Sequence, residues 1–250
     1  MKILCIGNSF SQDTTRVLPQ ILEGLGMHEY VVGNLYIGGC PIHKHYENFT
    51  EALPAYTYFR NDGRGWTQIH DTVITHALVS EKWDWVCIQH GSSYGGFYTE
   101  EESYALLPAL VEGLRSQTTA KIAFNLTWVG VPEHDRPEMI RFRRDQVRYF
   151  NAICDTTQRV VATIPGIERV CPTGTAVQNA RKMGLAHRLC RDGYHLSMGP
   201  GCYLAGMTFL KALTGCALEP ISWVPEDVSG EEKAILIAAA NQAIEQPYNC

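Results

Sequence analysis

The chain alternates short apolar runs with longer segments in which apolar residues recur every three or four positions. The apolar runs predict strands at residues 2–7, 30–37, 84–89, 121–129 and 167–172. The three- and four-residue spacing predicts helices at residues 14–25, 137–163, 198–214 and 229–246. Short buried strands that alternate with helices are typical of a parallel sheet covered by helices. The pattern therefore predicts an α/β protein with five parallel strands.

Residues 43–70 interrupt this alternation. An Asn61-Asp62-Gly63-Arg64 sequence lies there between aromatic-rich flanks, which is typical of a β-hairpin turn. We expect a hairpin that is inserted as a flap after the second strand. Because the sequence contains no internal repeat and no Pro/Gly-rich linker, we expect residues 1–250 to form one domain.

Composition removes several classes of function. The 250 residues are 45% hydrophobic and 19% charged, which is ordinary for a globular protein, and the net charge of −5 gives no support for nucleic-acid binding. The apolar stretch at residues 202–218 is interrupted by Lys211 and is too short to span a bilayer, so no membrane association is expected. The first apolar run is shorter than that of a secretory signal, and the nine cysteines are scattered. These two features favour a cytoplasmic protein without disulfides.

Polar residues follow each predicted strand. In open parallel sheets, ligands bind beyond the carboxyl ends of the strands, so these residues are the candidates for a site. They are Asn8-Ser9-Phe10-Ser11, Gly38-Gly39-Cys40, Gln89 to Ser93, Asn125 with Thr127, and, after a further helix, Asp192 with His195. Their convergence predicts one site at a single edge of the sheet.

Ser9, Asp192 and His195 are the residue types of nucleophilic catalysis. An imidazole with its ordinary pKa of about 6.5 can accept the proton of a serine hydroxyl. Asp192 could orient His195, or His195 could act with the support of the backbone alone. At a helix start, Ser9 would be surrounded by backbone N–H groups that stabilise an oxyanion.

Other interpretations of the first turn remain open. Ser9 could simply cap the helix that follows it. The hydroxyl-rich NSFSQDTT could also form the phosphate loop of a flavodoxin-like binding module, although it lacks the glycines of a P-loop. The second interpretation leaves the Asp192-x-x-His195 pair unexplained.

The order of these blocks resembles the SGNH/GDSL hydrolase superfamily. The resemblance extends from residue 3 to about residue 215 and implies a flavodoxin-like three-layer α/β/α sandwich. It also implies a serine esterase or acetylesterase without metal or organic cofactor, acting on a small ester such as an acetylated sugar. The implied nucleophile is Ser9, the implied general base is His195, and Asp192 orients that base.

The resemblance also implies an oxyanion hole. Its backbone donors correspond to Ser9 and Gly39, with Gly38 as an alternative to Gly39. The side-chain donor of the superfamily is an asparagine in the third block, but QHGSSYGG contains none. We assign Gln89 in its place, with Ser92 and Asn125 as alternatives. Asn8 stands where the superfamily usually has an aspartate.

Two further groups of residues could bind ligands. His43 and His45 form a His-x-His pair, but no carboxylate or third histidine lies at a spacing typical of metal ligands, so no metal site is expected. Four aromatic residues could either line a sugar-binding cleft or pack at the bases of loops; they are Trp66, Tyr94, Tyr98 and Trp128.

Overall fold

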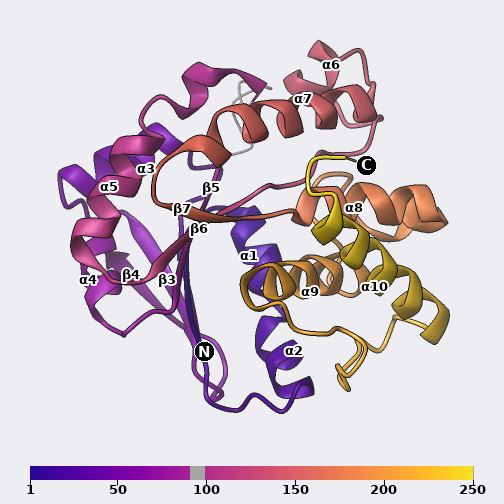
Figure 1. The fold of residues 1–250 in the computed structure, drawn as a ribbon, viewed down its shortest axis with the longest axis horizontal. Coiled ribbons are helices and arrows are strands. Elements are labelled where there is room, and N and C mark those ends of the chain that lie inside the picture. The colour runs from indigo at the N-terminus through magenta and orange to yellow at the C-terminus, as the bar shows by residue number, and fades with distance from the viewer. Residues whose placement is uncertain (91–98, 250) are drawn as a thin grey trace.

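The computed structural model describes residues 1–90 and 99–249. Its centre is a sheet of seven strands in the order β4-β3-β2-β1-β5-β6-β7 (Figure 1). Strands β2, β1, β5, β6 and β7 run parallel to one another, which confirms the five predicted strands and their direction. In chain order the strands are β1 Lys2–Gly7, β2 Val31–Tyr36, β3 Tyr56–Asn61, β4 Thr67–Thr72, β5 Trp85–Gln89, β6 Lys121–Asn125 and β7 Ile167–Cys171.

The hairpin predicted within residues 43–70 is present, but it is part of the sheet. Strand β3 pairs antiparallel with β2, and β4 pairs antiparallel with β3. The sheet therefore has seven strands where five were expected. The physical reason is that an unpaired edge exposes backbone N–H and C=O groups, and β3 supplies partners for those of β2.

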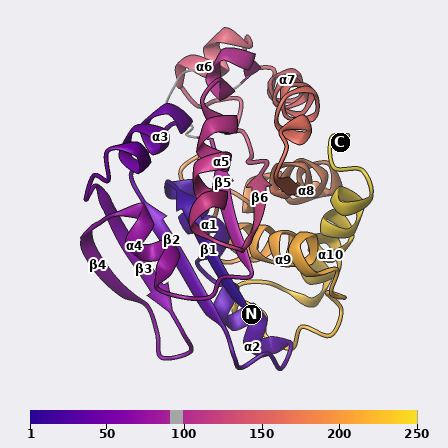
Figure 2. The same cartoon turned by 60° about the vertical axis from the view of Figure 1, so that its left-hand side comes forward.

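Helices cover both faces of the sheet (Figure 2). Successive side chains of a strand point to opposite faces, so Ile3 of β1 belongs to one apolar core and Leu4 to the other. The first core is covered by α1 (Ser9–Thr15), α2 (Leu18–Gly24), α8 (Thr173–Ala180), α9 (Pro200–Thr214) and α10 (Gly230–Glu245). The second is covered by α3 (Ile42–Thr50), α4 (Ile74–Val79) and α5 (Leu107–Gln117). The predicted three-layer α/β/α architecture is confirmed.

The first helix begins earlier than predicted and is broken in two. The side chain of Asn8 accepts the N–H of Phe10 at 3.0 Å and so caps α1. The helix therefore begins at Ser9 and not at residue 14. Pro19 has no N–H to donate to the preceding turn, and its ring would clash with that turn. One continuous helix over 14–25 is therefore replaced by α1 and α2.

The single helix predicted at 137–163 is also interrupted. Arg143 and Arg144 have positive φ angles of 56° and 58°, which end α6 (Pro137–Arg141). Asp145 then starts α7 (Gln146–Arg159) by accepting the N–H of Arg148 at 2.9 Å. Both helices pack on apolar side chains that follow β6. Short turns of helix complete the described chain at η2 (Glu101–Tyr104), η3 (Val161–Thr163), η4 (Arg181–Leu185) and η5 (Ala186–Arg188).

Candidate active site

Ser9 lies at the point where the central strand β1 passes into α1. It is the first residue of the helix and is partly exposed, whereas Asn8 before it is fully buried. The carboxyl ends of β1, β2 and β5 meet at this edge because the three strands are parallel neighbours. Ser9 is thus held at the edge where the sequence predicted a site.

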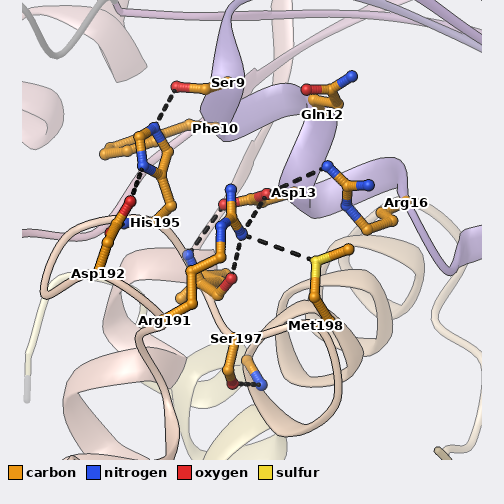
Figure 3. Close-up of polar contacts among 12 residues, drawn as sticks. Ser9, Phe10, Gln12, Asp13, Arg16, Arg191, Asp192, His195, Ser197 and Met198 are labelled. Carbon is orange, nitrogen blue, oxygen red and sulfur yellow. Dashed lines mark hydrogen bonds and ion pairs between the residues drawn. The ribbon is translucent and has the colours of Figure 1, made fainter.

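Asp192 and His195 form a tight turn that faces Ser9 (Figure 3). Asp192 Oδ1 accepts the backbone N–H groups of Tyr194 at 2.9 Å and of His195 at 2.7 Å. The other carboxylate oxygen lies 2.7 Å from His195 Nδ1, and His195 Nε2 lies 3.0 Å from Ser9 Oγ. The fold therefore brings together three residues separated by up to 186 positions, in the hydrogen-bonded order Ser–His–Asp.

The charge of Asp192 determines which ring nitrogen of His195 carries the proton. Partial burial acts to raise the pKa of Asp192, but hydrogen bonds from the His195 ring and from the two backbone N–H groups outweigh it and lower the pKa to about 2. The carboxylate is therefore ionised at neutral pH and accepts the Nδ1–H of His195. This leaves Nε2 as an acceptor for the Ser9 hydroxyl, the arrangement that general-base catalysis requires.

A buried carboxylate on α1 joins the serine helix to the histidine turn. Asp13 lies four residues after Ser9, is fully buried, and accepts the N–H of Leu196 at 2.9 Å and Nη1 of Arg191 at 3.0 Å. Arg191 also donates to the carbonyl of Leu196. Burial raises the pKa of Asp13, and the charge and hydrogen bond of Arg191 oppose this shift. Sequence reasoning missed Asp13, although its place one helical turn after Ser9 was a usable signal.

Asn8 connects three strand ends. Its Oδ1 accepts the N–H of Phe10 at 3.0 Å and Nε2 of Gln89 at 2.8 Å. Its Nδ2 donates to the carbonyls of Cys40 at 3.3 Å and of His90 at 3.2 Å. The side chain therefore fixes the turns after β2 and β5 relative to Ser9.

Gln89 is buried at the end of β5, at 1% exposure. Besides donating to Asn8, its amide accepts Nδ2 of Asn125 at 3.5 Å. Asn125 donates in addition to Thr14 Oγ1 at 3.3 Å and accepts from Thr173 Oγ1 at 2.8 Å. These contacts are those of side chains that brace the strand ends. The assignment of Gln89 to the oxyanion hole stays a prediction, and its alternative Ser92 lies outside the described residues.

The two glycines lie in the turn that follows β2. Gly39 has a positive φ of 62°, a backbone conformation that side chains with a Cβ rarely adopt, whereas Gly38 does not. Asn8 holds this turn through the Cys40 carbonyl. Gly39 as the backbone donor, with Gly38 as the alternative, stays a prediction.

The remaining candidate residues have distinct environments. His45 is fully buried and hydrogen-bonded through Nδ1 to the Tyr56 hydroxyl at 2.7 Å, and burial lowers its pKa to about 3. Trp128 is 1% exposed, stacks on Phe10 with ring centroids 4.3 Å apart, and donates its Nε1–H to the Tyr194 carbonyl at 2.9 Å. It therefore packs beneath the histidine turn. Trp66 remains 38% exposed, and Tyr94 and Tyr98 lie outside the described residues.

The described residues include neither a metal-binding cluster nor a helix suited to crossing a membrane. Across 1–90 and 99–249, no three His, Cys, Asp or Glu side chains are placed so that they could hold a metal ion. Within the same ranges, the helices fall short of the length and apolar character needed to cross a bilayer.

Solved structures show the same architecture. A crystal structure of a DUF4886 family protein from Bacteroides uniformis has a TM-score of 0.93 and is 30% identical, and the match covers 100% of this chain and 96% of that one. An acetylxylan esterase from Geobacillus stearothermophilus has a TM-score of 0.54 at 16% identity, covering 85% and 94% of the two chains. A candidate SGNH hydrolase from Slackia heliotrinireducens has a TM-score of 0.51 at 19% identity, covering 85% and 98%.

At 16% and 19% identity, the likeness to the last two structures shows a shared fold. No curated protein matches the sequence. The model of one family, described as a domain of unknown function (DUF4886), matches residues 2–243. Because that match spans nearly the whole chain, the protein belongs to the DUF4886 family.

Proposed function

We propose that this protein is a serine hydrolase that cleaves small esters through an acyl-enzyme. The observation that carries the proposal is the continuous hydrogen-bonded series from Ser9 Oγ through His195 to Asp192. A serine that merely capped a helix would not need an imidazole at 3.0 Å or a carboxylate behind it. The alternative, a flavodoxin-like phosphate or nucleotide-binding module, leaves this series without a role.

In the proposed reaction, Ser9 Oγ attacks the ester carbonyl while its proton moves to His195 Nε2. The negative charge on the former carbonyl oxygen is stabilised by the predicted donors, the backbone N–H groups of Ser9 and Gly39 and the amide of Gln89. His195 then returns the proton to the leaving alcohol, which leaves an acyl group on Ser9. Water, deprotonated by the same imidazole, releases the acid and regenerates the serine.

The proposed substrate is an acetylated carbohydrate or a related polar ester. The shared fold with an acetylxylan esterase supports an acyl-transfer site of this kind. The partly exposed Ser9 and His195 also support it, because a polar ester must reach both from solvent. We also propose a reducing compartment such as the cytoplasm, since the cysteines of the described chain are free thiols.

The test is turnover of p-nitrophenyl acetate and of acetylated xylose by wild type and Ser9→Ala. We expect the variant to lose several orders of magnitude in kcat while its melting temperature is retained. A fluorophosphonate should label wild type at Ser9 alone. Labelling at another residue, or wild-type rates in Ser9→Ala, would refute the proposal.

A further inference from the structure

A concave region lies beside α1, over the part of the sheet that β2 and β3 form. It has a volume of about 460 Å³, within the range of small-molecule sites. One wall is formed by α1 and α2, and the floor by Asn34 of β2 and Phe59 of β3, which are register partners and so share a face. The lining residues are Gln12, Thr15, Arg16, Val17, Gln20, Asn34, Phe59, Trp66 and Met198.

The floor of this pocket holds an unpaired polar group. Asn34 is 1% exposed, and its Oδ1 accepts the Ser11 hydroxyl at 2.8 Å. Its Nδ2 has no hydrogen-bond partner within residues 1–90 and 99–249, and neither have the buried Oε1 of Gln20 and Nε of Arg16 on the wall. Buried polar groups are nearly always hydrogen-bonded, so three such atoms around one cavity indicate that a ligand or water completes them.

Two aromatic rings give the pocket flat apolar surfaces. Trp66 donates its Nε1–H to the Arg16 carbonyl at 3.3 Å, which fixes the indole against the helical wall. Phe59 is held edge-on by Tyr36, with ring centroids 6.0 Å apart. The faces of such rings are electron-rich, so they attract the weakly positive C–H groups of a ligand.

The polar lining favours hydroxyl groups over a charged group. Carboxamides both donate and accept, as hydroxyls do, and three of them line the pocket: Gln12, Gln20 and Asn34. The cation of the lining, Arg16, lies 3.8 Å from the buried carboxylate of Asp13, which offsets its charge. In Figure 3, Gln12 and Arg16 lie to the right of Asp13, away from His195, with Met198 below them.

We propose that this pocket binds a neutral sugar residue of an oligosaccharide. The ring C–H groups pack on Trp66 and Phe59, and hydroxyls pair with Asn34 Nδ2 and Gln20 Oε1. The pocket begins at Gln12, three residues after Ser9, so its near end lies about one helical turn along α1 from the serine. Binding here does not depend on the chemistry proposed for Ser9.

The test is a titration of the ¹⁵N-labelled full chain with cellotriose, xylotriose and triacetylchitotriose, each to about 10 mM, a range that detects weak binding. We expect at least one to shift the Asn34 side-chain amide and the Trp66 indole resonances together and saturably. Trp66→Ala should weaken that binding at least about tenfold. The matched control is Ile69→Ala, because Ile69 is on the same hairpin, is 57% exposed, and pairs with Tyr58 on the opposite face from Phe59.

Turnover of p-nitrophenyl acetate by the Trp66 and Ile69 variants should equal that of wild type, which separates this result from the function of Ser9. The proposal is overturned if none of the three sugars shifts the Asn34 amide. It is also overturned if Trp66→Ala binds as well as Ile69→Ala does. Glucuronate that bound tenfold more tightly than glucose would contradict a neutral ligand and assign the pocket to carboxylates through Arg16.

Discussion

The two oxygens of the Asp192 carboxylate make different contacts. One oxygen accepts two backbone N–H groups and so shapes the turn, and the other orients the His195 ring. Because half of the side chain is exposed, at 49%, the pair contributes modestly to stability. Its larger effect is expected on the orientation of the imidazole.

We therefore predict that Asp192→Asn lowers kcat for p-nitrophenyl acetate by up to about 10⁴, because the amide no longer fixes the Nδ1–H tautomer. The loss should be smaller than that of His195→Ala, which removes the base itself. Steady-state kinetics of both variants at neutral pH measure this difference. Equal rates in wild type and Asp192→Asn would show that His195 acts with backbone support alone.

The same carboxylate makes stability depend on pH. Its pKa is lower in the folded chain, about 2, than the ordinary 3.8, so the ionised form stabilises the folded state above about pH 4. This contribution is lost as the pH falls through about 2. We predict that the melting temperatures of wild type and Asp192→Asn converge over this interval. A difference that stayed constant from pH 5 to pH 2 would contradict the assigned contacts.

The buried amide of Gln89 could have either of two functions: donating to an oxyanion or bracing the strand ends. An oxyanion donor should lose about 10²–10³ in kcat when it is removed, with little change in stability. A bracing residue should instead lower the melting temperature with little change in turnover per folded molecule. For Asn125→Ala we predict a lower melting temperature with little change in turnover, because the Asn125 amide contacts Gln89, Thr14 and Thr173. If Asn125→Ala abolishes turnover and Gln89→Ala does not, the donor comes from β6.

At the scale of elements, the contacts of Asn8 account for a difference between this sequence and the SGNH/GDSL pattern that it resembles. Its Nδ2 donates to two carbonyl oxygens, those of Cys40 and His90, and a carboxylate could not do this. An aspartate at this position would place negative charge against both carbonyls. The amide is therefore matched to the way this chain joins the turns after β2 and β5.

We predict that Asn8→Asp lowers the free energy of unfolding by about 1–3 kcal/mol at neutral pH, the usual cost of leaving buried partners unsatisfied. The helix cap is retained, because a carboxylate oxygen can still accept the Phe10 N–H. Urea unfolding measures the change, and Asn8→Ala, which loses the cap as well, provides the comparison. Stability equal to wild type at neutral pH would contradict the contacts described for Nδ2.

At the scale of the whole molecule, Asp13 connects the beginning of the chain to the turn near its end. Its bond to the Leu196 N–H spans 183 positions and holds the neighbour of His195 against the serine helix. Asp13 does not touch the reacting atoms, so it is a positioning residue. Its effect on catalysis should act through the distance between Ser9 and His195.

We predict that Asp13→Asn lowers kcat more than it changes KM, because substrate contacts are kept while the Ser9–His195 geometry loosens. The free energy of unfolding should fall by about 1–3 kcal/mol, since Arg191 loses its buried charge partner. Arg16→Gln is the control, because Arg16 lies at the longer distance of 3.8 Å from Asp13. Equal losses in both variants would show a purely structural contribution of this helix.

Much of the fold followed from local patterns. The strand at residues 2–7 was predicted with its observed bounds because it is a buried central strand with an unbroken apolar run. Helix α8 was expected after the fifth strand but without bounds, because all eight of its residues are buried and it has no polar face to produce a periodic pattern. The breaks at Pro19 and at Arg143 arise from backbone geometry that apolar spacing does not report.

The sequence by itself determined the parallel sheet and the residue types of the candidate site, since apolar periodicity and short-range spacing are local properties. Only the tertiary structure decided that His195 lies 3.0 Å from Ser9 and that the hairpin joins the sheet. It also decided that the amide of Gln89 contacts Asn8. These features depend on contacts between residues tens to hundreds of positions apart, and such contacts form only when the strands align and the buried polar groups find their partners.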